Sequence, residues 1–356
     1  MKAALISLGS KSSKWTLEAM RKYFAQVDDI DLRSIEVNLS SKNPEILYHG
    51  KPLETYDCVY AKGSFRYEQL LRGITSLLHK TTYMPLKPLS FTFGHDKLLT
   101  HLAFQQHKIP MPTTYLASTT EAAKKIMKKV NYPIVMKFPH GTQGKGVMFA
   151  DSYSSASSLL DALAALRQPF IIQEYIETGG VDIRAIVVGD KVVASMKRKA
   201  EVGEKRANIH AGGKGEPCQL DFHTSKIAVE AAKAIGADIC AVDLLESAKG
   251  FLIVELNVSP GLQGITQATG IDVAGKIAKY LYEQTKLRVE SGKKTGAKEA
   301  MNEIGIGEEK EIITTLDFRG GRILLPEVIT KITDLSDKSE VTIKASKGKL
   351  SIKKFS

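Results

Sequence analysis

Residues 251–261 read FLIVELNVSPG, a continuous apolar run that carries Glu255 and Asn257 and breaks at a Ser-Pro-Gly turn. An unbroken apolar run of this length, ended by turn residues, predicts a buried strand. Because side-chain direction in a strand repeats every two residues, the two oxygen-bearing side chains share one face. The stretch therefore predicts a strand that is apolar apart from one polar face.

The run AVDLL at 241–245 predicts the partner strand, and a short turn containing Gly250 joins the two. A three-residue hairpin loop with Gly250 in the left-handed conformation would set Asp243 directly opposite Glu255. Two carboxylates and the Asn257 amide would then converge where apolar neighbours exclude water. Such an oxygen cluster suits Mg²⁺ or Mn²⁺, which complete their shells with nucleotide phosphates and water. For an E-x-N pattern alone, a half-buried hairpin with ordinary polar residues on its wet face is the simpler interpretation, so the rest of the chain must decide.

The length and charge of the chain bound the choice of function. A chain of 356 residues is too long for one compact core and predicts two or three domains. The net charge of +11 fits nucleic-acid binding or anionic small substrates such as ATP. Much of the excess lies in a basic block at 196–214 and in the segment after Lys286. A general nucleic-acid surface is therefore not required.

The sequence contains no apolar run near the roughly 18 residues that cross a bilayer. The N-terminal run MKAALISLGSK lacks the small-residue cleavage site of a signal peptide. Three widely spaced cysteines, Cys58, Cys218 and Cys240, offer neither a disulfide framework nor a zinc site. We therefore expect a cytoplasmic protein without a membrane segment.

The first part of the chain, residues 1–92, alternates strand-like and helix-like runs, which is typical of an open α/β sheet. We expect strands at 3–8 and 57–61, and helices at 15–27 and 67–79. A further helix begins near His95.

From residue 132 onward, short β runs with glycine turns predominate, and a Gly189-Asp190 dipeptide predicts a hairpin. We expect helices at 225–235 and 273–285 in this part, which extends from 93 to 288. Residues 289–310 have few apolar side chains and predict a flexible linker. Residues 311–356 then read as a small β-rich module with the runs IITTLDF, RILLP, EVTIKA and KLSIKKF.

The run PIVMKFPHGTQGKGV at 133–147 places Lys137 in a strand and follows it with a glycine-rich loop that contains Gly144 and Gly146. Such a loop offers backbone N–H groups to phosphate oxygens, and the lysine adds a point charge. It is not a P-loop, because no G-x-x-x-x-G-K-[ST] is present. A hairpin with a flexible turn and a snorkelling lysine is the alternative.

Residues Gln173 to Ile176 end a buried strand, where a nucleotide could read main-chain groups, and Asp182 follows as a plausible acceptor for a ribose hydroxyl. Arg198, Arg206 and Asn208 could neutralise a transferring phosphoryl group. Solvated residues at a strand end and in a basic loop are the alternatives.

Taken in order, these segments resemble the ATP-grasp superfamily, and within it the RimK-like carboxylate–amine ligases. The resemblance covers about residues 1–285 and is most specific from Lys137 to Gly275. It rests on the Asp96-Lys97 pair that opens a helix and on a series of motifs: PIVMKFPHGTQGKGV, IIQEYIETGGVDIRAIVVGDKVVASMKRKA, KRANIHAGG, AVDLL, VELNVSPGLQGI and TGIDVAG.

The resemblance implies a pre-ATP-grasp α/β domain at 1–92 and an ATP-grasp fold of two α+β subdomains at 93–288. It also implies ATP and two Mg²⁺ or Mn²⁺ ions as cofactors. The resemblance implies that ATP is bound by three groups of residues: the phosphates by Lys97, Lys137, Gly144 and Gly146, the adenine by the hinge Glu174, Tyr175 and Ile176, and a ribose hydroxyl by Asp182.

The resemblance also implies that Arg206 and Asn208 face the γ-phosphate and the acyl phosphate. The implied metal ligands are Asp243, Glu255 and Asn257.

Enzymes of this kind phosphorylate a carboxylate with ATP, and an amine then displaces the phosphate to form an amide. The resemblance implies an amino-acid amine donor, usually glutamate or a related acidic amino acid, for which Arg198 would suit the negative charge. The acceptor could be a ribosomal protein tail, a carrier protein or a coenzyme with a terminal carboxylate. We expect loops 9–14 and 62–66 of the first domain to influence that choice.

The C-terminal runs LDFRGGRILLPEVITKI and SEVTIKASKGKLSIKKF resemble the SpoVT/AbrB swapped-hairpin module. Such modules usually form dimers by exchanging hairpins and often bind DNA, and Arg319 and Arg322 could contact phosphates. We expect a homo-oligomer, a dimer or tetramer, ahead of DNA contact.

Two other functions remain open from the sequence. One is a DNA-binding regulator whose ATP-grasp part senses a nucleotide. The other is a different ATP-grasp reaction, such as dipeptide ligation without glutamate.

Overall fold

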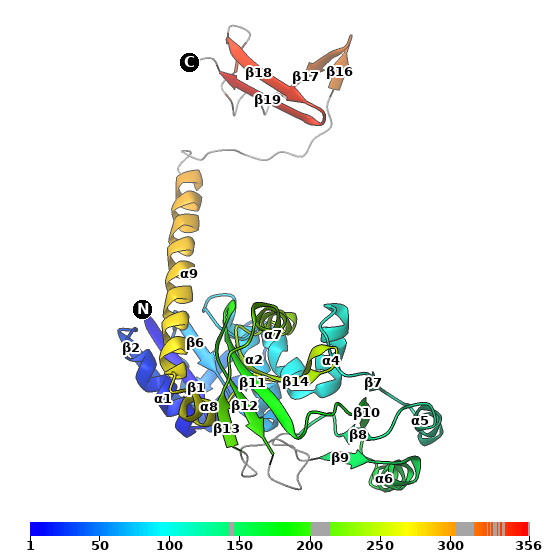
Figure 1. Cartoon of the computed structure of the whole chain (residues 1–356). Helices are drawn as coiled ribbons and strands as arrows, with labels where there is room; N and C mark the ends of the chain where they lie inside the picture. The colour runs from blue at the N-terminus through cyan, green and yellow to red at the C-terminus, as the bar shows by residue number, and fades with distance from the viewer. Residues whose placement is uncertain are drawn as a thin grey trace. The chain divides into compact units, whose positions relative to one another are not determined.

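The computed structural model describes residues 1–141, 146–200, 214–303, 317–325, 327, 329, 333, 335, 336 and 339–354. The chain divides into two compact units, Met1–Lys293 and Lys294–Ser356. Helices and sheets are mixed along the first unit, and β hairpins make up the strands of the second, as the sequence predicted. Figure 1 shows the whole chain, coloured from blue at the N-terminus to red at the C-terminus.

The N-terminal part of the first unit is built on a parallel sheet of three strands in the order β2-β1-β6. Its elements are β1 (Lys2–Ser7), α1 (Lys11–Met20), β2 (Gln26–Asp31), β6 (Cys58–Ala61) and α2 (Glu68–Leu78), with a small antiparallel sheet of β3 (Ile35–Asn38), β4 (Glu45–Tyr48) and β5 (Lys51–Pro52). All four residues of β6 are buried, as is usual for a strand in a covered parallel sheet.

The prediction of a helix at 15–27 was wrong at both ends. The helix begins at Lys11, because the Ser10 side chain accepts a hydrogen bond from Ser13 N and caps it. It ends at Met20, because Gln26 and Val27 pair with β1 in the parallel sheet. Local periodicity cannot reveal a pairing with a distant strand.

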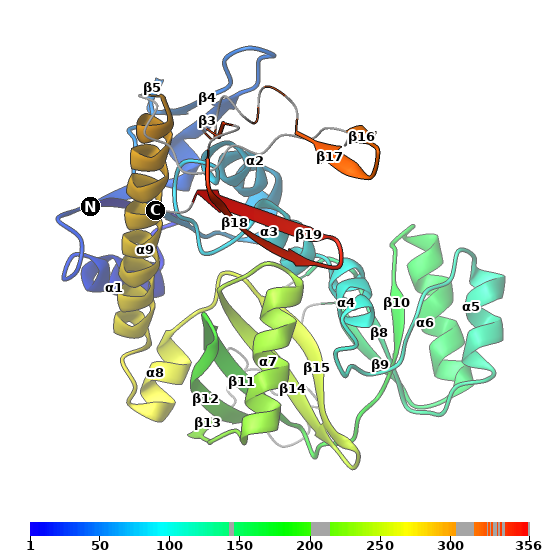
Figure 2. The ribbon, with the colours of Figure 1, turned by 90° about the horizontal axis from the view of Figure 1, so that it is seen from above.

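The middle part is an antiparallel sheet of four strands in the order β7-β10-β8-β9, with its own hydrophobic core. Its strands are β7 (Thr114–Tyr115), β8 (Ile134–Lys137), β9 (Val147–Ala150) and β10 (Ile171–Glu174), and its helices are α5 (Thr120–Met127) and α6 (Tyr153–Ala165). Figure 2 shows the two helices side by side next to this sheet.

The third part is an antiparallel sheet of five strands in the order β13-β12-β11-β14-β15. Its strands are β11 (Val181–Val188), β12 (Lys191–Lys199), β13 (Lys214–Pro217), β14 (Ile239–Ser247) and β15 (Gly250–Asn257). Its helices are α3 (Pro88–His95), α4 (Lys97–Gln106), α7 (Phe222–Ala234), α8 (Gln263–Thr269) and the start of α9 (Val273–Glu303). The predicted hairpin at Gly189-Asp190 joins β11 to β12.

The hairpin of β14 and β15 has the predicted pairing but not the predicted loop. Ser247 pairs with Gly250, so the loop has two residues and not three. A β-bulge then shifts the register between Asp243 and Leu244, because Val254 is an extra residue in β15. The bulge, and not the loop, sets Asp243 opposite Glu255.

The predicted linker at 289–310 begins as a helix. Helix α9 continues through Glu303, well beyond the predicted end at 285. Lysine, glutamate and alanine, frequent in this stretch, favour helix without requiring a buried face. Lys286 and Glu290 also form an i,i+4 ion pair of 3.9 Å.

The second unit contains two hairpins, one of β16 (Asp317–Arg319) and β17 (Arg322–Leu324) and one of β18 (Val341–Ser346) and β19 (Lys349–Lys354). They match the predicted runs RILLP, EVTIKA and KLSIKKF, whereas residues 312–316 of IITTLDF lie outside the described residues. Phe318 and Ile343 are 62% and 59% exposed. The hairpins therefore present apolar side chains that the described part of this chain does not cover.

A pair of glycines tests how α9 docks on the five-stranded sheet. Gly189 has φ +65°, and a Cβ there would overlap the ring of Tyr280, which lies in α9. Gly270 has φ +69° and open space around it. We expect Gly270→Ala to cost about 1 kcal/mol through the left-handed backbone alone. Gly189→Ala should cost a further ~1–3 kcal/mol through overpacking.

Urea unfolding of the two variants checks this expectation. Equal urea midpoints for the two variants would show that the Tyr280 ring can move aside without loss of stability, and therefore that α9 is loosely packed at this point.

Candidate active site

A cleft of about 800 Å³ lies within the first unit and takes residues from all three of its parts. Most of the sequence-predicted site residues line it, namely Lys97, Lys137, Glu174, Tyr175, Ile176, Asp182, Asp243, Glu255 and Asn257. Gly146 lies next to the lining residue Val147. Gly144, Arg206 and Asn208 lie outside the described residues.

Lys137 ends β8 and is only 8% exposed. Its Nζ donates to Oε1 of Gln173 at 2.6 Å, and Nε2 of Gln173 contacts Nε2 of His101 at 2.9 Å. Because an ammonium only donates, Gln173 must turn its NH₂ group to His101, whose Nδ1 then carries the proton and donates to the Lys97 carbonyl at 2.6 Å. Burial lowers the pKa of Lys137 to about 8 and that of His101 to about 4. The lysine is thus a positioned cation on a neutral support.

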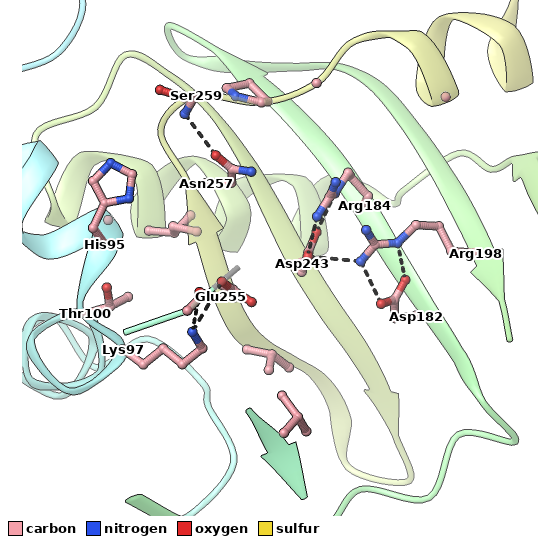
Figure 3. A pocket seen from close by; sticks show the side chains of 18 of the residues that line it. His95, Lys97, Thr100, Asp182, Arg184, Arg198, Asp243, Glu255, Asn257 and Ser259 are labelled. Atoms are coloured by element: carbon pink, nitrogen blue, oxygen red, sulfur yellow. Dashed lines mark hydrogen bonds and ion pairs between the residues drawn. The ribbon is translucent and has the colours of Figure 1, made fainter. Parts of the chain in front are cut away.

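Lys97 is the first residue of α4, and the Asp96 carboxylate caps that helix through the N–H groups of Leu98 and Leu99, at 2.8 and 3.0 Å. The prediction that Asp96 and Lys97 open a helix is confirmed. Lys97 Nζ donates to the Gly141 carbonyl at 3.0 Å and lies 3.7 Å from Glu255 Oε1 (Figure 3). Lys97 therefore connects the start of the glycine loop to the polar face of β15.

Gly146, the last residue of the glycine loop before β9, has a backbone φ of +79°. A Cβ at this position would overlap the Phe138 ring, and Phe138 N donates to the Gly146 carbonyl at 3.1 Å. Only glycine fits both the backbone conformation and the space.

The predicted adenine-reading hinge, Glu174 to Ile176, begins at the last residue of β10. Glu174 N donates to the Thr113 carbonyl at 2.9 Å, and the strand ends there. The Tyr175 ring packs edge-on against Phe149, with 5.9 Å between the ring centroids. Tyr175 and Ile176 thus line the cleft from a segment outside any strand.

The carboxylate of Asp243 is turned toward two arginines and not toward Glu255 (Figure 3). Its Oδ1 and Oδ2 accept from Arg184 Nε and Nη2 at 2.8 and 2.7 Å, and Oδ2 lies 2.9 Å from Arg198 Nη2. Burial would raise the pKa of Asp243, but the two guanidinium groups hold it well below its usual range. The expected convergence of three metal ligands is therefore not found in this arrangement.

Asp182 and Arg198 belong to the same network. Asp182 accepts from Arg198 Nε and Nη2, both at 2.6 Å. Burial raises the pKa of Asp182 to about 6, against the opposing charge of Arg198. The charge of Arg198 is thus balanced by two carboxylates, which leaves it poorly suited to the anionic amine donor that the sequence had suggested.

The predicted metal ligands Glu255 and Asn257 of β15 face the cleft with oxygens that keep lone pairs available. Glu255 is 41% exposed, and the Asn257 Oδ1 accepts one bond, from Ser259 N at 2.9 Å, and keeps a second lone pair. In the described part of the chain, no three His, Cys, Asp or Glu side chains cluster closely enough to hold a metal. One carboxylate and one amide still fit Mg²⁺, which needs few protein ligands when phosphates complete its shell. The Asp243 carboxylate accepts three bonds from guanidinium groups, so it could bind a metal only through the remaining lone pair of Oδ1 or after a guanidinium releases it.

Sequence reasoning missed Arg184 and Gln173 as functional neighbours. Arg184 lies two residues after Asp182, so alternation placed both on one face of a strand. That signal was available, but the pairing of Arg184 with Asp243 depends on β11 lying beside β14. Gln173 stood in the predicted hinge run, and only the pairing of β10 with β8 brings it to Lys137.

No helix in the described ranges is both long enough and apolar enough to cross a membrane.

Comparison with known proteins gives consistent results. Residues 94–281 match the RimK-like ATP-grasp domain. The chain is 37% identical over 289 residues to a probable alpha-L-glutamate ligase of Marinomonas sp. (strain MWYL1), covering 79% of this chain and 95% of that protein. It is also 37% identical over 294 residues to a probable alpha-L-glutamate ligase of Halorhodospira halophila, covering 80% and 96%.

Among solved structures, the ATP-grasp ligase PsnB, complexed with a minimal precursor, Mg and ADP, superposes with a TM-score of 0.63 at 17% identity. The superposition covers 80% of this chain and 98% of PsnB, which confirms the ATP-grasp fold. With its domain match, its relatives and its fold in agreement, the chain belongs to the RimK-like ATP-grasp family of ATP-dependent carboxylate–amine ligases.

Proposed function

We propose that the cleft joins glutamate, or a related amino acid, through its amine to a carboxylate acceptor by way of an acyl phosphate. The observation that carries the proposal is the gathering of two lysines, Lys97 and Lys137, and the side-chain oxygens of Glu255 and Asn257 in one cleft. The names of the two relatives, both probable alpha-L-glutamate ligases, support glutamate as the amino acid.

In this proposal the nucleotide lies between the four-stranded and the five-stranded sheet. Lys97 and Lys137 bind its phosphates, which carry the opposite charge. The segment Glu174 to Ile176 reads the adenine through main-chain groups. Asp182 accepts from the ribose, for which its oxygens need lone pairs beyond those that Arg198 occupies. ATP binding by this chain is further supported by the ADP in the PsnB complex.

Glu255 and Asn257 would hold a divalent ion, with Asp243 as a third ligand through the remaining lone pair of its Oδ1 or after a guanidinium releases it. Mg²⁺ is favoured, because PsnB was solved with Mg and ADP, and Mn²⁺ has the same preference for oxygen. When bound, the ion neutralises charge that develops on the transferring phosphoryl group.

The chain's own groups orient the reactants and exclude water. Lys137 is held in place by Gln173 and His101, so its charge does not reorganise during the reaction. Arg206 and Asn208 match the family's R-x-N pattern and would face the γ-phosphate and the acyl phosphate. A closed cleft protects that acyl phosphate from hydrolysis.

We further propose that the C-terminal unit, which resembles an AbrB-like module, pairs with a second copy. The exposed Phe318, Ile343 and Leu350 support pairing, because each is at least 49% exposed and apolar. DNA contact is a weaker proposal. Arg319 already lies 3.5 Å from Asp317, which leaves Arg322 as the more available charge at this turn.

The proposed reaction predicts release of ADP. Purified full-length protein with Mg²⁺ should release ADP when acidic amino acids are screened against carboxylate acceptors. If the protein binds ATP but releases no ADP with any pair of amine and carboxylic acid, the ligase assignment is wrong. Turnover with neutral amino acids alone would instead favour the dipeptide ligase.

Glu255→Gln should lower turnover by more than about 100-fold, because several kcal/mol of metal-dependent charge stabilisation depend on this carboxylate. The matched control is Glu246→Gln, an exposed carboxylate of β14 that pairs with Lys197 at 3.9 Å. Thermal melts of both variants should equal that of the wild type. Full activity in Glu255→Gln would remove this residue from the metal site.

Lys137→Met should weaken ATP binding by about 10- to 100-fold, the loss expected for a charged hydrogen bond to phosphate. Melting temperature should change little, because the variant removes a buried charge but also leaves Gln173 Oε1 without its donor. Lys124→Met removes an exposed lysine of the same sheet domain, which pairs with Asp161, and should bind ATP normally. Calorimetric titration with a non-hydrolysable ATP analogue measures both, and equal affinities would contradict the role of Lys137.

Deletion of residues 311–356 should lower the number of subunits in the native assembly while leaving ADP release intact. Light scattering at several protein concentrations measures the assembly. An unchanged subunit count would count against pairing through the C-terminal unit.

A further inference from the structure

Lys62 follows β6 directly and lines the cleft from the N-terminal part of the first unit. It is 5% exposed, and burial lowers its pKa to about 8, so it still carries its proton at neutral pH. Within the described ranges no carboxylate lies at ion-pair distance from its Nζ. Its hydrogen bond to the Pro260 carbonyl is long, at 3.4 Å. Its Nζ also lies 5.7 Å from the centroid of the Tyr60 ring, a weak cation–π contact. These contacts supply no counter-charge, and a buried cation without one is costly.

Two hydroxyl groups line the cleft from neighbouring segments. Ser12 Oγ accepts from Leu262 N at 2.8 Å, and Ser259 Oγ accepts from Gly63 N at 2.9 Å. Each hydroxyl can therefore donate its own proton, for which the described residues provide no acceptor. An ammonium and two hydroxyl donors with no acidic neighbour form a set that matches an anion.

This donor set lies beside the polar end of β15. Ser259 N donates to the Asn257 Oδ1 at 2.9 Å, so the segment that carries the donors continues directly from the proposed metal ligand (Figure 3). His95 lines the same end of the cleft, and its buried Nε2 has no hydrogen-bond partner in the described part of the chain. An anion at Lys62 would therefore lie in the same cleft as the proposed metal ligand Asn257.

We propose that Lys62, Ser12 and Ser259 form a subsite for a substrate carboxylate that does not react. The proposal rests on the proposed function and deepens it, because it makes a negative charge on the substrate a requirement of this cleft. Both substrates of that function can supply such a group: the amine donor keeps its carboxylates when its amine reacts, and an acidic acceptor can keep a second one. The buried position of Lys62 favours a compact group such as a carboxylate.

The test is calorimetric titration of the full chain saturated with a non-hydrolysable ATP analogue and Mg²⁺. L-Glutamate and N-acetyl-L-glutamate serve as probes, because the second has carboxylates but no free amine. We expect Lys62→Met to weaken the binding of one probe by about 10- to 100-fold and to leave the affinity for the ATP analogue unchanged. Loss for L-glutamate alone assigns the subsite to the amine donor, and loss for the N-acetyl compound assigns it to the acceptor.

Three further measurements separate binding from structure. Lys62→Arg keeps the charge and should retain binding within a few-fold. Lys51→Met removes an exposed lysine of the N-terminal part, outside the cleft, and should behave as the wild type. The melting temperature of Lys62→Met should hold or rise, whereas a purely structural role for Lys62 predicts a fall.

Equal affinity of Lys62→Met and wild type for both probes, or no binding of either probe by the wild type, would overturn the subsite. Failure of the proposed function looks different, because it appears as absent ADP release with every amine–acid pair. An enzyme that releases ADP only with neutral substrates would keep the ligase and lose the subsite.

Discussion

One extra residue in a strand sets the chemistry of the cleft. Val254 bulges out of β15, and this shift brings Glu255 opposite Asp243 and places Asn257 on the same face. Arg184 of β11 lies on the other side of Asp243 in the same row of the sheet. Without the bulge, the two-residue loop would put Glu255 out of register with Asp243, and the row of charged side chains would be broken.

The burial of these charges explains how they are arranged. Two carboxylates, Asp182 and Asp243, and two guanidinium groups, Arg184 and Arg198, neutralise one another on one face of the sheet. Buried charges are costly unless they are paired, and in this network each carboxylate is paired with a guanidinium group. Lys137 and Lys62 are also buried, and within the described residues neither lies at ion-pair distance from a carboxylate. In our proposals the substrates supply their counter-charge.

The cleft is a product of three separate parts of the chain. The segment after β15 is tied to the N-terminal part by the bonds of Ser259 to Gly63 and of Leu262 to Ser12. On the other side, Lys97 reaches from α4 to the Gly141 carbonyl at the start of the glycine loop. Each of these hydrogen bonds joins residues far apart in the sequence, and together they fix the polar end of β15 against both neighbouring parts.

The sequence by itself determined that residues 251–257 and 241–245 form strands, that Glu255 and Asn257 share a face, and which motifs the chain has in common with its family. Hydrophobic periodicity and turn residues are local features, so they can be recognised from the sequence alone. Only the tertiary structure decided that Asp243 is bound by two arginines and that residues 26–27 belong to β2 and not to α1. It also decided that Lys62 is buried with no carboxylate of the described residues at ion-pair distance. Those facts depend on which strands pair and on which side chains are buried, and the local spacing of residues predicts neither.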